Sequence, residues 1–281
     1  MNTRPPGAGS SFIVHRSSLS VMGIVNVTPD SFSDGGVYFD RSQAIEAALR
    51  MEQDGAAIID VGGESTRPGS EAVDEGEELD RVVPVIEGIR ARSGVTISID
   101  TRKANVARAA LDAGADLIND VSALRHDPEL ATLAAQRGVP VILMHMRGEP
   151  RTMQENIHYD DVVEEVMREL SEWRDDAMAA GVAEDQILVD PGIGFGKTYD
   201  HNLELLARCE EFTRLAPVVI GASRKGFIGH LTGQPSGPTR MAGSLAAVAA
   251  AHRGEATIVR VHDVRETVDF LKVLGAIEAW R

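Results

Sequence analysis

The chain of 281 residues carries 28 basic and 43 acidic side chains, a net charge of −15, and a single cysteine. The negative balance argues against nonspecific binding to nucleic acid or to an anionic membrane, so a bound anion would need a local group of basic side chains. One cysteine excludes an internal disulfide, which is typical of proteins in a reducing cytosol.

The first residues, MNTRPPGAGSS, contain no apolar signal segment. We expect residues 1–18 to form a flexible tail and residues 19–281 to form one domain. No run approaches the roughly 18 apolar residues of a membrane span. We therefore expect a cytoplasmic protein that does not bind membranes.

Eight short apolar segments alternate with helix-like stretches along the rest of the chain, and each ends in a polar or charged residue. The predicted strands are VMGIVN (21–26), AIIDVGGE (57–64), VTISID (95–100), DLIND (116–120), VPVILMH (139–145), ILVD (187–190), PVVIGASRK (217–225) and TIVRVHD (257–263). Helices are expected near 41–54, 75–91, 103–113, 128–136, 160–180, 201–214, 239–253 and 264–279. Eight strand–helix units predict a single (β/α)8 TIM barrel with parallel strands, an α/β fold whose chemistry lies at the C-terminal ends of its strands.

Two connections are unusually long and rich in Gly, Ser, Asp and Pro. They are TPDSFSDGGVYFD after the first strand and STRPGSEAVDEG after the second. This composition prevents regular packing, so we expect long, mobile loops. An open doubly wound sheet is the structural alternative, but it needs a Gly-rich nucleotide loop after the first strand, which VNVTPDSFSDGG does not supply.

The alternation of side chains within the strands predicts which ones point into the barrel, because residues i and i+2 share a face. In VTISID the polar face would point inward, while the face of Val95, Ile97 and Ile99 would pack under helices. The polar residues that close the predicted strands are Asn26, Glu64, Asp100, Asn119, His145, Asp190, Lys225, Arg260 and His262. Burying ionisable groups is costly unless they are paired or used, so their convergence predicts one functional pocket. With 4% aromatic residues, the core should consist of Val, Ile, Leu and Ala.

Five motifs identify a family that the chain resembles over about residues 20 to 275. They are MGIVNVTPDSFSDGG (22–36), IIDVGGESTRPGS (58–70), DPGIGFGK (190–197), SRK (223–225) and RVHDV (260–264). On these motifs the chain resembles the dihydropteroate synthases of folate biosynthesis, the targets of sulfonamides. The resemblance implies a Mg²⁺-dependent transferase of a pterinylmethyl group. Its substrates would be 6-hydroxymethyl-7,8-dihydropterin diphosphate and p-aminobenzoate, its products 7,8-dihydropteroate and diphosphate, and its assembly a homodimer.

The resemblance also implies roles for individual residues. Asn26 would hold Mg²⁺ on the substrate's diphosphate, and Arg260 and His262 would bind the anion. The residues implied in the pterin and p-aminobenzoate sites are Asp100, Asn119, Met144, Asp190, Phe195, Ser223 and Lys225, with Phe32 from the first loop and Thr66, Arg67 and Pro68 from the second. Gly226 occupies a position beside the p-aminobenzoate site where relatives often carry Ser or Arg.

The chemistry of these residue types agrees with those roles. Mg²⁺ prefers hard oxygen ligands and keeps several waters, so one amide oxygen plus phosphate oxygens is sufficient. Arg260 can bind phosphate in a bidentate manner with His262 donating beside it; the alternative is a salt bridge to a carboxylate at the barrel mouth. Positive charge would develop on the pterin methylene as diphosphate leaves, and our hypothesis is that Asp100 stabilises it. Asp100, Lys225, Arg260 and His262 are the expected catalytic residues.

Other functions fit the sequence less well. Lys225 at a strand end could form a Schiff base, but the flanking SRK motif argues against it. DPGIGFGKT is not a phosphate-binding P-loop, because Pro191 stands where the first Gly is required. A non-catalytic pterin-binding paralogue is disfavoured by the intact loop motifs. A folate-binding methyltransferase domain would need neither a diphosphate cluster nor an STRPG loop.

Overall fold

The computed structural model describes residues 19–28, 37–65, 69–149 and 151–280. The predicted tail and the sequence-predicted substrate residues Phe32, Thr66, Arg67 and Pro68 lie outside the described residues, as do residues 29–36 of the first long loop and 66–68 of the second.

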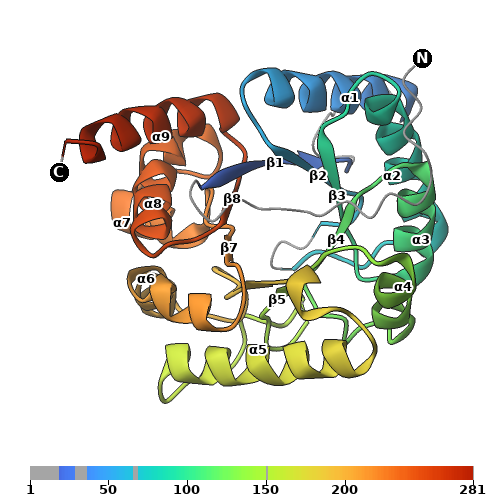
Figure 1. The fold of residues 1–281 in the computed structure, drawn as a ribbon. Helices are drawn as coiled ribbons and strands as arrows, with labels where there is room; N and C mark the ends of the chain where they lie inside the picture. The colour runs from blue at the N-terminus through green and yellow to red at the C-terminus, as the bar shows by residue number, and fades with distance from the viewer. Residues whose placement is uncertain (1–18, 29–36, 66–68, 150, 281) are drawn as a thin grey trace.

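Eight parallel strands form the centre of the molecule. They are β1 (Ser20–Asn26), β2 (Ile58–Gly62), β3 (Thr96–Asp100), β4 (Leu117–Asp120), β5 (Val141–Met144), β6 (Ile187–Asp190), β7 (Val219–Ile220) and β8 (Ile258–Val261). Their order is β6-β5-β4-β3-β2-β1-β8-β7, and a parallel bridge between Val189 and Val218 joins the two ends. The helices surround the strands (Figure 1). The predicted (β/α)8 barrel is therefore confirmed.

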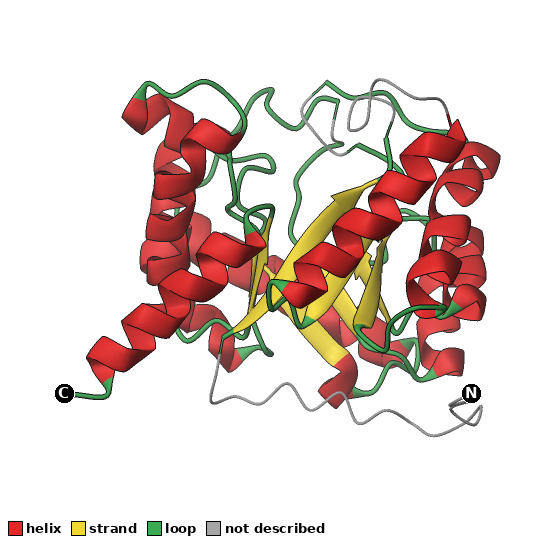
Figure 2. Ribbon diagram, turned by 90° about the horizontal axis from the view of Figure 1, so that it is seen from above, coloured by secondary structure: helices red, strands yellow, loops and turns green. Residues whose placement is uncertain are grey.

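Each predicted helix has a counterpart in the structure. The helices are α1 (Val37–Gln53), α2 (Glu75–Arg90), α3 (Ala104–Ala113), α4 (Glu129–Arg137), α5 (Val162–Ala179), α6 (Tyr199–Ala207), α7 (Gly226–Thr232), α8 (Met241–Arg253) and α9 (Val264–Glu278). Figure 2, turned by 90° from Figure 1, shows the helices on the outside of the strands. Among the described residues, no helix is long and apolar enough to span a bilayer.

The sequence reading was wrong at two helices. The predicted helix 201–214 is α6 followed by a 3₁₀ turn, Cys209–Arg214. Helix α7 lies between the predicted strand 217–225 and the predicted helix 239–253, where no helix was expected, because its glycines have low helix propensity. Phe227 and Ile228 are buried there, so tertiary packing outweighs the local preference.

Apolar side chains form two separate layers, as the alternation predicts. An inner layer fills the barrel with one side chain from each of seven strands: Met22, Ile58, Leu117, Ile142, Leu188, Val219 and Ile258. The outer layer packs strands against helices and includes Ile97 and Ile99 of β3. It consists mainly of Val, Ile, Leu and Ala, which confirms the predicted aliphatic core.

Candidate active site

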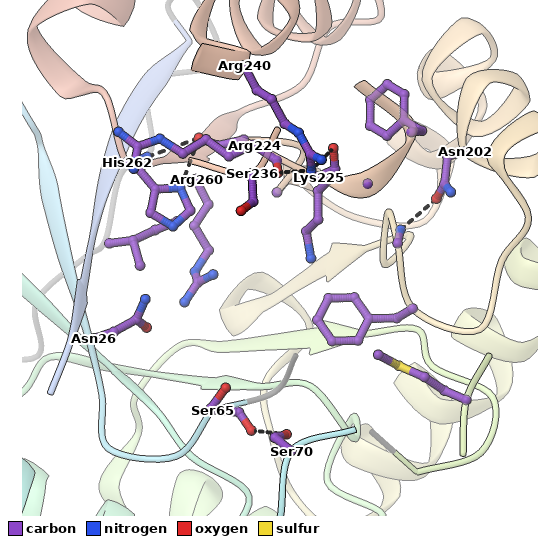
Figure 3. A pocket seen from close by; sticks show the side chains of 18 of the residues that line it. Asn26, Ser65, Ser70, Asn202, Arg224, Lys225, Ser236, Arg240, Arg260 and His262 are labelled. Atoms are coloured by element: carbon purple, nitrogen blue, oxygen red, sulfur yellow. Dashed lines mark hydrogen bonds between the residues drawn. The ribbon is translucent and has the colours of Figure 1, made fainter. Parts of the chain in front are cut away.

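A pocket of about 1080 Å³ is lined by residues at the C-terminal ends of the strands and in the loops that follow them. Seven of the predicted residues line it: Asn26, Asp100, Phe195, Ser223, Lys225, Arg260 and His262. Figure 3 shows Asn26, Arg260 and His262 near one another and Lys225 reaching into the same hollow. Residues more than 230 positions apart in the chain thus meet in one place, as the barrel predicts.

Three predicted residues lie beneath this wall instead of forming it. Asn119, Met144 and Asp190 are each 5% exposed. Met144 packs in one apolar group with Phe195. Asp190 accepts a hydrogen bond from the Gly192 amide at 2.7 Å. These three residues are buried next to residues that line the pocket, and together we call them the floor of the pocket.

The expectation that His145 faces the pocket was wrong. His145 is fully buried, its Nε2 lies 3.0 Å from Glu169 Oε2, and its ring stacks on Trp173 at 5.1 Å. The physical reason is alternation: Met144, its neighbour in the chain, takes the inward position, so His145 points outward toward α5. Glu64 does line the pocket, where it pairs with Arg102 and Lys103.

Arg260 is held between two buried carboxylates. Its Nε donates to Asp60 Oδ2 at 2.6 Å and its Nη2 donates to Asp100 Oδ2 at 2.7 Å. Asn119 Nδ2 also donates to Asp60 Oδ2, at 3.2 Å. The salt bridge considered as an alternative for Arg260 is therefore present, and Arg260 lines the pocket as well.

The sequence analysis did not predict Asp60 as a site residue. In the predicted strand 57–64 it considered only Glu64, the last polar residue. The same alternation would have found it, since Asp60 shares a face with Ile58 and Gly62. The register of β2 and β3 confirms that Asp60 is on the inward face, because Asp60 pairs with Ser98, which is on the predicted inward face of β3.

Two carboxyl groups of the site have pKa values raised toward neutrality. Burial raises the pKa of Asp100 to about 7, against the opposing effect of Arg260 and with a further increase from Asp60. Burial raises the pKa of Asp190 to about 6, although the Gly192 amide and Lys225 oppose it. Both groups can therefore gain or lose a proton near neutral pH.

His262 is a neutral ring in this site. Burial, together with the nearby positive charges of Arg224 and Arg260, lowers its pKa to about 3. Ser223 Oγ accepts from the His262 backbone amide at 3.2 Å and lies 3.0 Å from Nδ1. If the serine hydroxyl donates to Nδ1, the ring proton is on Nε2, and His262 is a neutral hydrogen-bond donor.

A second residue that the sequence reading missed is Lys197, in the DPGIGFGK motif. It is 2% exposed, and its Nζ contacts His145 Nδ1 and donates to Phe195 O, both at 2.9 Å. Burial lowers its pKa to about 7.

The loop of the same motif passes close to β5. At Gly192 a Cβ would lie 1.9 Å from His145 O, so only glycine allows this loop to pass. The loop carries Phe195, whose ring lies 4.0 Å below Lys225 Nζ.

The turn that carries Lys225 is held by two further arginines. Arg224 has a φ of 59° and donates through Nη2 to Asp263 Oδ1 at 2.5 Å. Arg240 Nη1 donates to the carbonyls of Arg224 and Lys225, both at 3.2 Å. The two arginines were not expected as site residues, because their contacts span segments far apart in the chain.

The described residues offer no group of three or more His, Cys, Asp or Glu side chains placed to hold a metal. Asn26, at the end of β1, is half-buried and lines the same pocket as Arg260 and His262. Its amide carbonyl is a hard oxygen donor, which fits a Mg²⁺ ion that takes its other ligands from substrate and water.

Comparison with known proteins shows the family. A model described as pterin binding enzyme matches residues 22–262. The dihydropteroate synthase of Escherichia coli K12 is 51% identical over 259 residues, which cover 91% of this chain and 90% of the relative. The chain belongs to the dihydropteroate synthase family. It is a transferase of that family, as the motifs predicted.

Solved structures of the family superpose closely on this chain. The dihydropteroate synthase of Xanthomonas albilineans with 4-aminobenzoic acid has a TM-score of 0.89 and 48% identity, with 94% of each chain covered. The same enzyme in complex with 7,8-dihydropteroate has a TM-score of 0.85 and 46% identity, with 94% of this chain and 95% of the other covered. The chain is therefore similar to dihydropteroate synthases both in sequence and in three-dimensional structure.

Proposed function

We propose that this chain catalyses the Mg²⁺-dependent condensation of 6-hydroxymethyl-7,8-dihydropterin diphosphate with p-aminobenzoate, giving 7,8-dihydropteroate and diphosphate. The observation that carries the proposal is the meeting of Arg260, Lys225 and His262 with the buried carboxyls of Asp100 and Asp190 around one pocket. The related enzyme from Xanthomonas albilineans, solved with 4-aminobenzoic acid and with 7,8-dihydropteroate, supports this choice of ligands.

The pterin would lie on the floor of the pocket. Asp190 can accept from ring N–H groups, and Asn119 can both donate and accept. A Cβ at Gly221 would lie 3.7 Å from Asp190 Oδ2 and 3.9 Å from Arg260 Cβ. A side chain there would occupy the space between the two functional residues, so glycine keeps this space open for a flat ring. Phe195 and Met144 would form the apolar walls.

The diphosphate would lie at the ends of β1 and β8. Arg260 supplies a guanidinium that matches phosphate geometry, and neutral His262 supplies a donor. Mg²⁺, held by Asn26, would neutralise charge on the departing diphosphate. Interactions that strengthen as the leaving group departs lower the barrier.

Asp100 would act on the reacting carbon. As the carbon–oxygen bond breaks, positive charge develops on the pterin methylene, and a carboxylate in a buried site stabilises such charge more than one in water. The p-aminobenzoate amine then forms the new carbon–nitrogen bond and loses a proton. Lys225, above Phe195, would contact the pterin from the side of α7.

We also propose that the chain acts in the cytoplasm as a homodimer. Helix α8 is rich in Ala and Val, but its Ser244, Ala247, Val248 and Ala251 are buried against the rest of the fold. Among the described residues, the most exposed large apolar side chains are Trp280 (93%), Leu231 in α7 (61%), and Val273 (61%) and Ile277 (56%) in α9. Sedimentation at rising concentration tests this: Ile277→Lys should yield monomer, and a wild-type monomer at all concentrations contradicts the proposal.

Diphosphate release by the purified protein tests the reaction. It is measured with pterin diphosphate, with and without p-aminobenzoate and Mg²⁺. Release that needs Mg²⁺ and accompanies dihydropteroate formation supports the proposal. Tight pterin binding without product would instead favour the non-catalytic paralogue.

A further inference from the structure

Asp60 touches two residues of the proposed substrate site without lining the pocket itself. It is in the middle of β2 and 0% exposed. One of its oxygens, Oδ2, accepts from Arg260 Nε of β8 at 2.6 Å and from Asn119 Nδ2 of β4 at 3.2 Å. A single carboxylate oxygen therefore links the residue proposed to bind diphosphate with one proposed to bind the pterin.

The chemistry of a carboxylate makes this contact directional. An ionised carboxylate can only accept hydrogen bonds. The Asn119 amide must then turn its nitrogen toward Asp60, which leaves its carbonyl oxygen as an acceptor for a ligand. Arg260 is held in the same way: its Nε is bound to Asp60 and its Nη2 to Asp100, so the plane of the guanidinium is fixed.

We propose that Asp60 is a positioning residue for the pterin: it acts through Asn119 to orient the pterin-binding amide, while the diphosphate-binding role of Arg260 does not depend on the charge of Asp60. The identity of the two ligands rests on the proposed function. The contacts of Asp60 do not depend on it.

Asp60→Asn is the variant that tests this role. Within the described part of the chain Asp60 Oδ1 makes no hydrogen bond, so an NH₂ group in its place breaks none. The remaining oxygen can still accept from Arg260 Nε. That oxygen is now part of a neutral amide and accepts more weakly than a carboxylate oxygen, so it holds the Asn119 amide less firmly. The cluster also loses one negative charge.

The two ligands should therefore respond differently. We expect the Kd of an uncharged hydroxymethylpterin to rise about tenfold, the effect of one charge-assisted hydrogen bond. The Kd of Mg²⁺-diphosphate should stay equal or fall, because a nearby negative charge is gone. Isothermal titration calorimetry measures both. A parallel rise in both values indicates structural damage alone and overturns the proposal, as does no change in either.

Asp116→Asn is the matched control. Asp116 Oδ2 accepts from Arg90 Nη2 at 2.6 Å and from the Ile97 amide at 2.9 Å, and it does not line the pocket. It loses the same charge from another Asp–Arg pair, in which the Asp116 side chain is 27% exposed and that of Asp60 is 0% exposed. Both Kd values should equal those of the wild type. If pterin binding weakens here as much as in D60N, the effect is not specific to Asp60.

A double-mutant cycle locates the route of the effect. If Asp60 acts on the pterin through Asn119, D60N should add nothing to the loss of pterin affinity already caused by Asn119→Ala. Additive losses contradict that route. Should D60N fail to fold, NMR of the wild type is decisive: the Arg260 Nε–H should exchange slowly with solvent, and rapid exchange contradicts the contact.

The pH profile gives a readout that packing alone would not change. The charged groups acting on Asp100 are, in decreasing order, Arg260, Asp60, Glu78 and Asp120. Because Asp60 raises the pKa of Asp100, D60N should shift the acid limb of kcat/KM to lower pH, and an unshifted limb contradicts this.

The outcomes separate the two proposals. A wild type that binds both ligands but forms no dihydropteroate contradicts the proposed function only. An active wild type with an unchanged D60N contradicts the Asp60 role only.

Discussion

Two buried charged clusters flank the pocket, and they differ in how completely their groups are paired. In the first, defined by Asp60, Asp100 and Arg260, two carboxylates share one guanidinium. In the second, defined by Lys197, His145 and Glu169, Lys197 Nζ contacts His145 Nδ1 and donates to Phe195 O, and His145 Nε2 can donate to Glu169.

The comparison shows why a shifted pKa does not by itself identify a catalytic group. Burial brings the pKa of both Asp100 and Lys197 to about 7. The ammonium of Lys197 is committed to protein acceptors, whereas the Asp60–Asp100–Arg260 cluster has an excess negative charge that a cationic reaction centre can use. We therefore expect changes at Asp100 and Arg260 to alter turnover and changes at Lys197 to alter binding.

Arg260→Leu should have the largest effect. It leaves two buried carboxylates without their cation, which costs about 3–5 kcal/mol. Activity should fall below detection, and the loss of stability should be smaller at pH 5 than at pH 8, because Asp100, whose pKa burial raises to about 7, can then be neutralised by a proton. Thermal unfolding at both pH values checks this. Equal losses at the two pH values would contradict it.

Asp100→Asn should lower kcat about 100-fold, the scale of one lost electrostatic contact to a transition state. The Kd of the pterin diphosphate should change much less. Single-turnover kinetics with saturating substrate separates the two quantities. An unchanged kcat would show that Asp100 does not stabilise the developing charge.

Lys197→Met belongs to the second cluster. It removes the hydrogen bond that the charged Lys197 Nζ donates to Phe195 O, in the loop that carries a proposed wall of the pterin site. The loss of one such bond should raise KM for the pterin about tenfold, with a smaller change in kcat. The pKa of Lys197 is lowered on folding, so between about pH 7 and its unfolded value the unfolded state binds more protons. Wild-type stability should therefore gain from this group as the pH rises above 7. K197M should lack that gain, and identical pH–stability curves would contradict the assignment.

Glu169→Gln should have the smallest effect. Burial raises the pKa of Glu169, but hydrogen bonds from His145 and Arg147 outweigh it and lower the pKa to about 2. The carboxylate thus stabilises the fold above its unfolded pKa, and this contribution is lost as pH falls toward 2. We expect a loss of about 1 kcal/mol at pH 7 that disappears at low pH, with kcat unchanged. Urea unfolding at pH 7 and near pH 2 measures it.

The strand pattern explains how far the site could be predicted. Alternation placed Asp100 inward, and the structure agrees. The same rule would have turned His145 outward and revealed Asp60, had strands 2 and 5 been read by parity instead of by their last polar residue. Helix α7 lay beyond such a reading, because its glycines disfavour a helix that burial of Phe227 and Ile228 stabilises.

The sequence by itself determined the eight strand–helix units, the two faces of the strands and the motifs of the family, because these depend on local periodicity and residue order. Only the tertiary structure decided which charges meet. Arg260 finds its partners 200 and 160 positions away, at Asp60 and Asp100. Such pairing, and the burial that shifts the pKa values, exist only once β8 closes against β1, since a buried charge is set by its whole surroundings.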